Sequence, residues 1–205
     1  MNMPKLDGLK GRGMIMYYKL SCFYKRDVFF FYSDENRYDR RELEKGNRCQ
    51  VDGGLTYIVD KFDTYLSTYD ILPTVGPPLV SAKFKEIIER HCENDCVFIP
   101  VEIKSTKTKE QNNDFFAMIV SNSVVCLNKE KSEYKPSIKS LPDGPISINY
   151  VVYIPDSLGV HHIVRMEESK HLIVVDEVFV NLCKENSING VTFIKEGSLQ
   201  RPEYL

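Results

Sequence analysis

The stretch that decides the fold is VSAKFKEIIERHCENDCVFIPVEI, residues 80–103. In its first half Phe84, Ile87 and Ile88 fall at positions i, i+3 and i+4, and His91 follows at i+7. Residues with this spacing lie on one face of an α-helix, while charged residues take the other face. Burial of each of the three apolar side chains is worth roughly 1.5–3 kcal/mol before entropy costs. The stretch therefore predicts an amphipathic helix packed against a core.

Both ends of this helix are marked in the sequence. Ser81 is a suitable N-cap, because its hydroxyl can accept a hydrogen bond from an unpaired amide of the first turn. From Cys96 to Ile103 the chain is rich in apolar and β-branched residues, which favour a strand. We therefore predict a principal helix over about 80–93, with a strand directly after it.

A second principal helix is predicted near the C-terminus, over about 177–186. Asp176 is a suitable N-cap for it. Apolar residues then follow with helical spacing, namely Val178, Phe179, Leu182 and Cys183. Short apolar, β-branched or aromatic runs elsewhere predict strands at 14–24, 28–32, 55–59, 115–120, 124–127, 146–154, 163–166 and 191–194.

The order of these elements indicates the fold class. Strands that follow one another directly favour antiparallel pairing, so we expect an α+β fold with a mostly antiparallel sheet and two principal helices. The charged residues 25–27 suit a hairpin turn between the first two strands. No internal repeat is evident in the sequence. We expect one domain over 14–205, preceded by a flexible leader over 1–13.

Composition and charge exclude several classes of protein. The 205 residues are 42% apolar and 27% charged, which is ordinary for a folded domain and unlike a disordered chain. The formal net charge of -2 provides no strong field for nucleic acid or an anionic membrane. No stretch reaches the roughly 18 apolar residues that span a bilayer. Six cysteines without a secretory signal indicate reduced thiols, so we expect a soluble, cytoplasmic protein.

His91, Cys92 and Cys96 are the best candidates for a metal site. The spacing of the two cysteines suits zinc, and a histidine lies beside them. A structural zinc site needs four ligands, however, and a second pair is missing. Packing at the end of the helix explains all three residues. We therefore expect no metal and no cofactor.

Recognisable motifs for catalysis are missing as well. The sequence contains no Gly-x-Ser-x-Gly elbow, no phosphate-binding P-loop and no Gly-x-Gly-x-x-Gly fingerprint. His161 and His162 point to opposite faces if they lie on a strand, so we expect one to be partly buried and one solvated. The main expectation is a protein that is not an enzyme. The alternative is a hydrolase-like enzyme with a catalytic histidine and carboxylate, drawn from His161, His162, His171, Glu167 and Asp176.

The region from Phe29 to Arg48 mixes tyrosines with charged residues. Protein interfaces favour Tyr and Arg, which bury much area at a modest cost in conformational entropy. The alternative is a solvated loop, because most charged runs are simply exposed. The candidate partner-binding residues are Tyr32, Asp34, Glu35, Tyr38, Arg40 and Arg41.

Several short segments resemble those of a known family in the same order along the chain. They are MYYKL at 16–20, PPLVSAKF at 77–84, VFIPV at 97–101, VCLN at 125–128 with KSE at 131–133, and INGVTF at 188–193. The chain thus resembles the family-11 immunity proteins of bacterial polymorphic toxin systems, with the family-43 immunity proteins as a near competitor. Asn128 stands where an Asp is expected, and residues 34–48 match no motif of the family.

The resemblance implies an antitoxin in the bacterial cytoplasm. Such a protein binds the toxin domain encoded by a neighbouring gene and blocks it by occlusion. The resemblance implies no catalytic residues, and it implies that the matching segments are structural rather than toxin-contacting. The expected partner is therefore a cognate toxin domain, not nucleic acid or a membrane.

Overall fold

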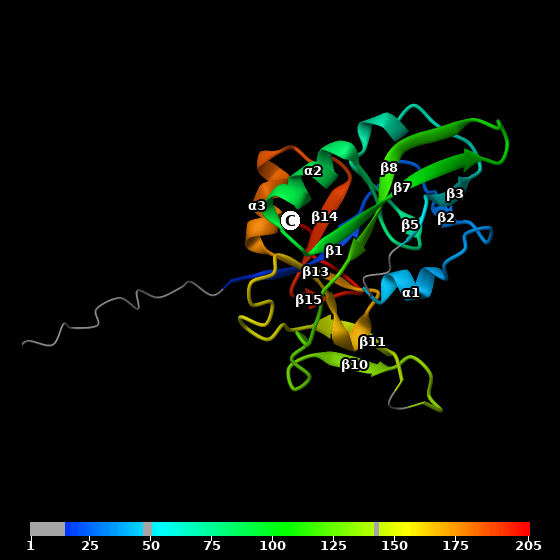
Figure 1. Ribbon diagram of the computed structural model, residues 1–205. Helices are drawn as coiled ribbons and strands as arrows, with labels where there is room; N and C mark the ends of the chain where they lie inside the picture. The colour runs from blue at the N-terminus through cyan, green and yellow to red at the C-terminus, as the bar shows by residue number, and fades with distance from the viewer. Residues whose placement is uncertain (1–14, 47–50, 142–143) are drawn as a thin grey trace, which may run out of the picture.

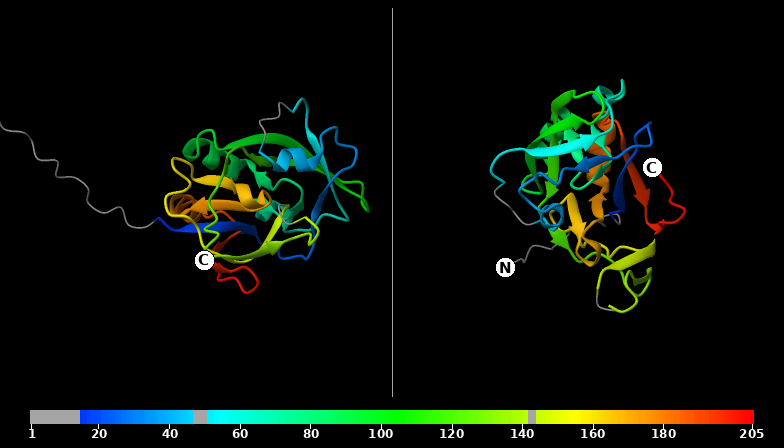
Figure 2. Two further views of the ribbon diagram at one scale, coloured as in Figure 1. Left: turned by 90° about the horizontal axis from the view of Figure 1, so that it is seen from below. Right: turned by 90° about the vertical axis from the view of Figure 1, so that its right-hand side faces the viewer.

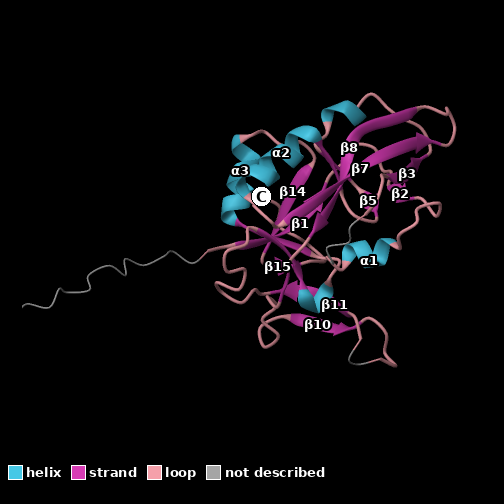
Figure 3. Cartoon of the chain, viewed as in Figure 1, coloured by secondary structure: helices cyan, strands magenta, loops and turns pink. Residues whose placement is uncertain are grey.

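The computed structural model describes residues 15–46, 51–141 and 144–205 (Figure 1). Strands form most of the regular structure, together with three α-helices in the described part of the chain (Figure 3). This arrangement confirms the α+β fold class. The predicted leader over 1–13 lies outside the described residues, as do Arg48 and Cys49.

The largest sheet is mixed and is built around a long hairpin. Strands β7 (Cys96–Ser105) and β8 (Gln111–Val120) form that hairpin, and the strand order is β4-β6-β8-β7-β3-β2-β5. Two pairs are parallel, β3 with β7 and β2 with β5, whereas the others are antiparallel. The remaining strands are β2 (Phe30–Tyr32), β3 (Leu55–Val59), β4 (Ile71–Leu72), β5 (Thr74–Val75) and β6 (Leu79–Ser81).

Two smaller sheets complete the molecule. The five-stranded sheet has the order β14-β1-β13-β12-β9, and the three-stranded sheet has the order β10-β11-β15. Figure 2 shows the three-stranded sheet beside the five-stranded one, away from the largest sheet. The five strands are β1 (Tyr17–Cys22), β9 (Ser123–Val124), β12 (Ile163–Met166), β13 (Ile173–Asp176) and β14 (Val191–Lys195). The three strands are β10 (Glu133–Pro136), β11 (Ile146–Val151) and β15 (Gly197–Ser198).

Two units of the fold share one architecture. In the first, β6 leads through α2 (Ala82–His91) to β7, and both strands pair antiparallel with β8 between them. In the second, β13 leads through α3 (Glu177–Glu185) to β14, and both strands pair antiparallel with β1. Each is a parallel strand–helix–strand unit with an inserted strand. This repetition is one of topology, and the sequence shows no corresponding repeat.

The caps of the two helices are equivalent. The Phe84 amide donates to Ser81 Oγ at 3.2 Å, and the Phe179 amide donates to Asp176 Oδ1 at 2.9 Å. Both predicted N-caps are therefore confirmed. Each helix buries the residues three and seven positions after its cap, which are Phe84 and Ile88 in α2 and Phe179 and Cys183 in α3.

The helix faces differ from the predicted ones in detail. His91 is exposed, whereas Cys92 is buried, because the core-facing row of α2 runs at i, i+4 and i+8 from Phe84. Likewise Val178 is 47% exposed while Val180 is buried in α3. Both helices are thus rotated slightly from the faces that the apolar spacing indicated.

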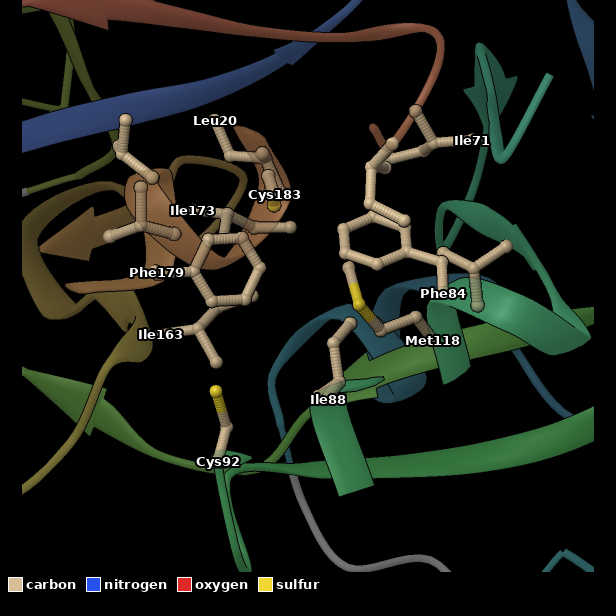
Figure 4. Packing of buried hydrophobic residues seen from close by; sticks show 14 of the residues in the cluster. Leu20, Ile71, Phe84, Ile88, Cys92, Met118, Ile163, Ile173, Phe179 and Cys183 are labelled. Carbon is tan, nitrogen blue, oxygen red and sulfur yellow. The ribbon is translucent and has the colours of Figure 1, made fainter. Parts of the chain in front are cut away.

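The main core lies between the seven-stranded and the five-stranded sheet and includes residues of α2 and α3 (Figure 4). Phe84 and Phe179 approach across it with ring centroids 6.1 Å apart. On β6 the neighbours Leu79 and Val80 enter different cores, because successive residues of a strand face opposite ways. A second core fills the other face of the largest sheet, and a third lies between the two smaller sheets.

The predicted hairpin at 25–27 does not form. Strand β1 belongs to the five-stranded sheet and β2 to the seven-stranded sheet, so the two do not pair. Among the helices that the structure describes, none has the length and apolar character that a membrane crossing requires.

Candidate functional site

The predicted partner-binding residues lie at the end of β2 (Tyr32), on the loop after it, and on the short helix α1 (Arg40–Glu44). Asp39 caps this helix, because its Oδ1 accepts from the Arg41 amide at 2.8 Å. Leu43 is fully buried in the second core and ties α1 to the largest sheet. The segment therefore has a defined conformation on the surface of the domain.

The two tyrosines of the set are bound into the structure. The Tyr32 hydroxyl donates to the Tyr38 carbonyl oxygen at 2.7 Å, and the Tyr32 ring packs edge-on against Tyr57 at 5.5 Å. The Tyr38 hydroxyl accepts from the Asp52 amide at 3.1 Å. Both side chains are half-buried, so their first role is to hold the loop.

The charged members of the set are better placed to meet a partner. Asp34, Glu35 and Arg41 are exposed, whereas Arg40 is half-buried, with its Nη1 3.8 Å from Glu44 Oε1. The residues from Tyr32 to Arg41, with the exception of Glu35, line a shallow hollow of about 430 Å³. The hollow carries charges of both signs on a fixed backbone, an arrangement that suits contact with a complementary charged surface. Partner binding by these residues stays a prediction.

The adjacent histidines directly before β12 pair with two buried carboxylates. His161 Nδ1 lies 2.6 Å from Asp95 Oδ1, and His162 Nδ1 lies 2.7 Å from Asp176 Oδ2. The side chains of both histidines are 32% exposed, so the expectation that one would be solvated is wrong. The two carboxylates belong to different elements: Asp95 follows α2, and Asp176 caps α3.

These carboxylates also hold the backbone. Asp95 Oδ2 accepts from the His162 amide at 3.0 Å, while Asp176 Oδ1 caps α3. The Asn122 side-chain amide adds a bond to Asp95 Oδ1 at 3.0 Å. The pairs therefore fasten the C-terminal side of α2 and the N-terminus of α3 to the same short segment, directly before β12.

The residues of the alternative enzyme hypothesis are not gathered in one place. Of the two candidate carboxylates, Asp176 meets His162, whereas Glu167 binds Ser123 Oγ and, at 3.1 Å, Lys170 Nζ. His171 Nδ1 lies 3.2 Å from Ser169 Oγ instead. Sequence reasoning missed Asp95 as a histidine partner, because 66 positions separate it from His161.

The metal candidates do not converge either. His91 is exposed and Cys92 is buried, and burial raises the pKa of the Cys92 thiol to about 12. In the described ranges no three His, Cys, Asp or Glu side chains gather as a ligand set. Sequence reasoning also missed Arg165, which is 2% exposed, although a charged residue inside the apolar strand β12 was a visible signal.

The comparison with protein families accounts for most of the chain. The model of the immunity protein family Imm11 matches residues 40–198, from α1 to the last strand. The match begins at Arg40, so Tyr32, Asp34, Glu35 and Tyr38 precede it. No curated protein matches the chain. Because the family match covers well over half of the 205 residues, the chain belongs to the Imm11 family and is an immunity protein.

Proposed function

We propose that this immunity protein neutralises its toxin by binding the toxin domain and covering its active site, without catalysing a reaction itself. The toxin is the product of a neighbouring gene in a bacterial polymorphic toxin system, and the complex forms in the cytoplasm. The membership of the immunity family carries this proposal. A protein that acts by occlusion needs a rigid surface of roughly 800 Å² and no active site of its own.

The proposed contact surface is the hollow from Tyr32 to Arg41. Its support is the combination of an ordered backbone with exposed charges: Asp34 and Arg41 line the hollow, and the exposed Glu35 lies on the same loop. Charges at the rim of an interface select the partner, because a like-charged surface is repelled. Four of the six predicted residues precede the family match, as suits a surface that changes with the toxin it meets.

The test is co-expression with the C-terminal toxin domain of the adjacent open reading frame. The wild type should form a complex and relieve toxicity. Glu35→Lys and Arg41→Glu should each weaken the complex about tenfold, which corresponds to about 1.4 kcal/mol. The matched controls Glu185→Lys and Arg90→Glu reverse exposed charges on α3 and α2, and they should leave the affinity unchanged. A wild type that neither binds nor protects would exclude the proposal.

The assignment of the contact surface can be wrong even if the proposed function is right. If the wild type binds and protects but neither reversal at Glu35 or Arg41 changes the affinity, the toxin uses another face. Hydrogen exchange of the complex would then identify that face by its slowed amides.

The enzymatic alternative rests on one observation, the 2.7 Å contact between His162 Nδ1 and Asp176 Oδ2. The helix cap made by the other oxygen of Asp176 explains that carboxylate without catalysis. Single His→Ala replacements at 161, 162 and 171 decide between the two. Protection that survives all three replacements, in variants that remain folded, excludes catalysis by these histidines.

A further inference from the structure

A second hollow, of about 560 Å³, lies where α1 meets the seven-stranded and the five-stranded sheet. Its titratable lining residues come from α1, β12 and the turn before β13, namely Arg40, Glu44, Arg165 and His171. Its walls are otherwise largely apolar, with Leu20, Phe29, Leu72, Val75 and Ile173 among them. A ligand site commonly has this composition, in which an apolar wall surrounds a few polar groups.

Arg165 is the unusual group in this hollow. Its side chain is 2% exposed, and Nη1 donates to the Lys170 carbonyl oxygen at 2.8 Å. Nε and Nη2 are buried, and neither has a hydrogen-bond partner within the described ranges. A guanidinium keeps its charge in proteins, and a buried charge without partners is costly. Most buried polar groups in folded proteins are paired, so the two free donors require an explanation.

The geometry of the free donors indicates what would satisfy them. Nε and Nη2 lie on one edge of the planar guanidinium, so their N–H groups point in the same direction. A carboxylate accepts two parallel hydrogen bonds from such an edge, and this bidentate pair is among the strongest in proteins.

The charges around the hollow favour one negative ligand group. Burial is the main cause that lowers the pKa of His171, and the nearby positive charges of Lys19 and Arg165 lower it further. Among the described lining residues the only carboxylate belongs to Glu44, and its ion-pair partner is Arg40. The charge of Glu44 also acts on the guanidinium of Arg165, but it forms no hydrogen bond with Nε or Nη2. These two donors are thus left for another acceptor, while Glu44 opposes a second negative charge.

We propose that this hollow binds the carboxylate of a ligand with an apolar body, held by Nε and Nη2 of Arg165. Two sources supply such a group. One is a free aryl or alkyl carboxylic acid, and the other is an acidic side chain of the toxin with apolar neighbours. The second source rests on the proposed function, whereas the first does not. Arg40 lines both this hollow and the one at Tyr32–Arg41, which places the carboxylate site next to the proposed contact surface.

The direct test uses 3-phenylpropanoate and its neutral amide, 3-phenylpropanamide, with the full chain and no toxin. The acid should bind with a Kd on the order of 1 mM, as expected for a ligand of this size. At ten times Kd it should raise the Tm by roughly 3–6 °C. The amide should bind at least tenfold more weakly. Equal binding of acid and amide would overturn the proposal, because it would reveal an apolar pocket without carboxylate recognition.

Variants separate recognition from folding. Arg165→Met keeps the length of the side chain but removes its donors, so it should abolish binding of the acid. The Tm of this variant without ligand should be equal or higher, since an unpaired charge has been removed. Glu44→Gln should tighten acid binding, and it keeps the test informative if Arg165→Met fails to fold. An acid that binds Arg165→Met as well as the wild type, or no better binding by Glu44→Gln, would overturn the proposal.

Competition then identifies the source of the carboxylate. If a toxin side chain supplies it, 3-phenylpropanoate at ten times Kd should weaken the toxin complex about elevenfold by simple competition. An unchanged complex assigns the site to a free acid. If the toxin does not bind at all, the proposed function fails, but the measured binding of the acid to the wild type stands.

Discussion

The contact between Phe84 and Phe179 should be a main source of stability, because it joins the two strand–helix–strand units. Phe84 is 0% exposed and Phe179 is 1% exposed, and their rings are 6.1 Å apart. Phe84→Ala leaves a cavity in this core, for which the expected cost is about 3–5 kcal/mol. For a chain of this size the Tm should fall by roughly 6–20 °C. Urea denaturation followed by circular dichroism measures the change in the free energy of unfolding.

Phe31→Ala is the matched control, because Phe31 is 49% exposed and the same atoms are removed. Its cost should stay within about 1 kcal/mol. The double variant Phe84→Ala/Phe179→Ala should show a coupling energy of about 0.5–1.5 kcal/mol, the value typical of an aromatic pair. If Phe84→Ala costs no more than Phe31→Ala, or if the two core variants are strictly additive, the helices do not stabilise each other in this way.

Three further predictions concern caps and thiols. In urea denaturation Ser81→Ala should cost about 1 kcal/mol, the value typical of a lost N-cap. Asp176→Ala should cost more, because Asp176 is a buried carboxylate that both caps α3 and pairs with His162, whereas Ser81 is a neutral hydroxyl that caps α2 and donates to Asp70. Burial raises the pKa of Cys126 and Cys183 to about 12. Below the pKa of a thiol in the unfolded chain both thiols are neutral, and their burial then contributes fully to the free energy of unfolding. The free energy of unfolding should therefore fall as the pH rises from about 8.5 towards 12, and a flat profile would contradict this. At pH 8 iodoacetamide should label these two thiols only after unfolding, which mass spectrometry can follow.

The sequence was most informative where structure depends on neighbours in the chain. Both long helices and both N-caps were predicted, because a cap is a contact over three residues and a helix face repeats within four. The α+β class followed from the order of the elements. The helix faces were shifted by about one residue, since the exact rotation depends on which sheets cover the helix.

Contacts between distant segments were not predictable from local pattern. Nothing in the region of 25–27 indicates that β1 and β2 enter different sheets, because strand pairing depends on partners such as β13 and β3. The pairing of His161 with Asp95 joins residues on two separate elements. The two repeated strand–helix–strand units could not be predicted from the sequence for a related reason. They share caps and topology, whereas their strands differ in length and their buried side chains in type.

The histidine pairs explain how the repeated units are joined. His161 and His162, the two residues directly before β12, reach Asp95 behind α2 and Asp176 at the start of α3, so this short segment fastens both units. Three residues after His162, within β12, Arg165 lines the hollow beside α1 with two free donors. The strand that continues from the fastened segment thus carries the proposed carboxylate site. A ligand held by Arg165 would rest on a part of the fold that both units keep rigid, which lowers the entropic cost of binding.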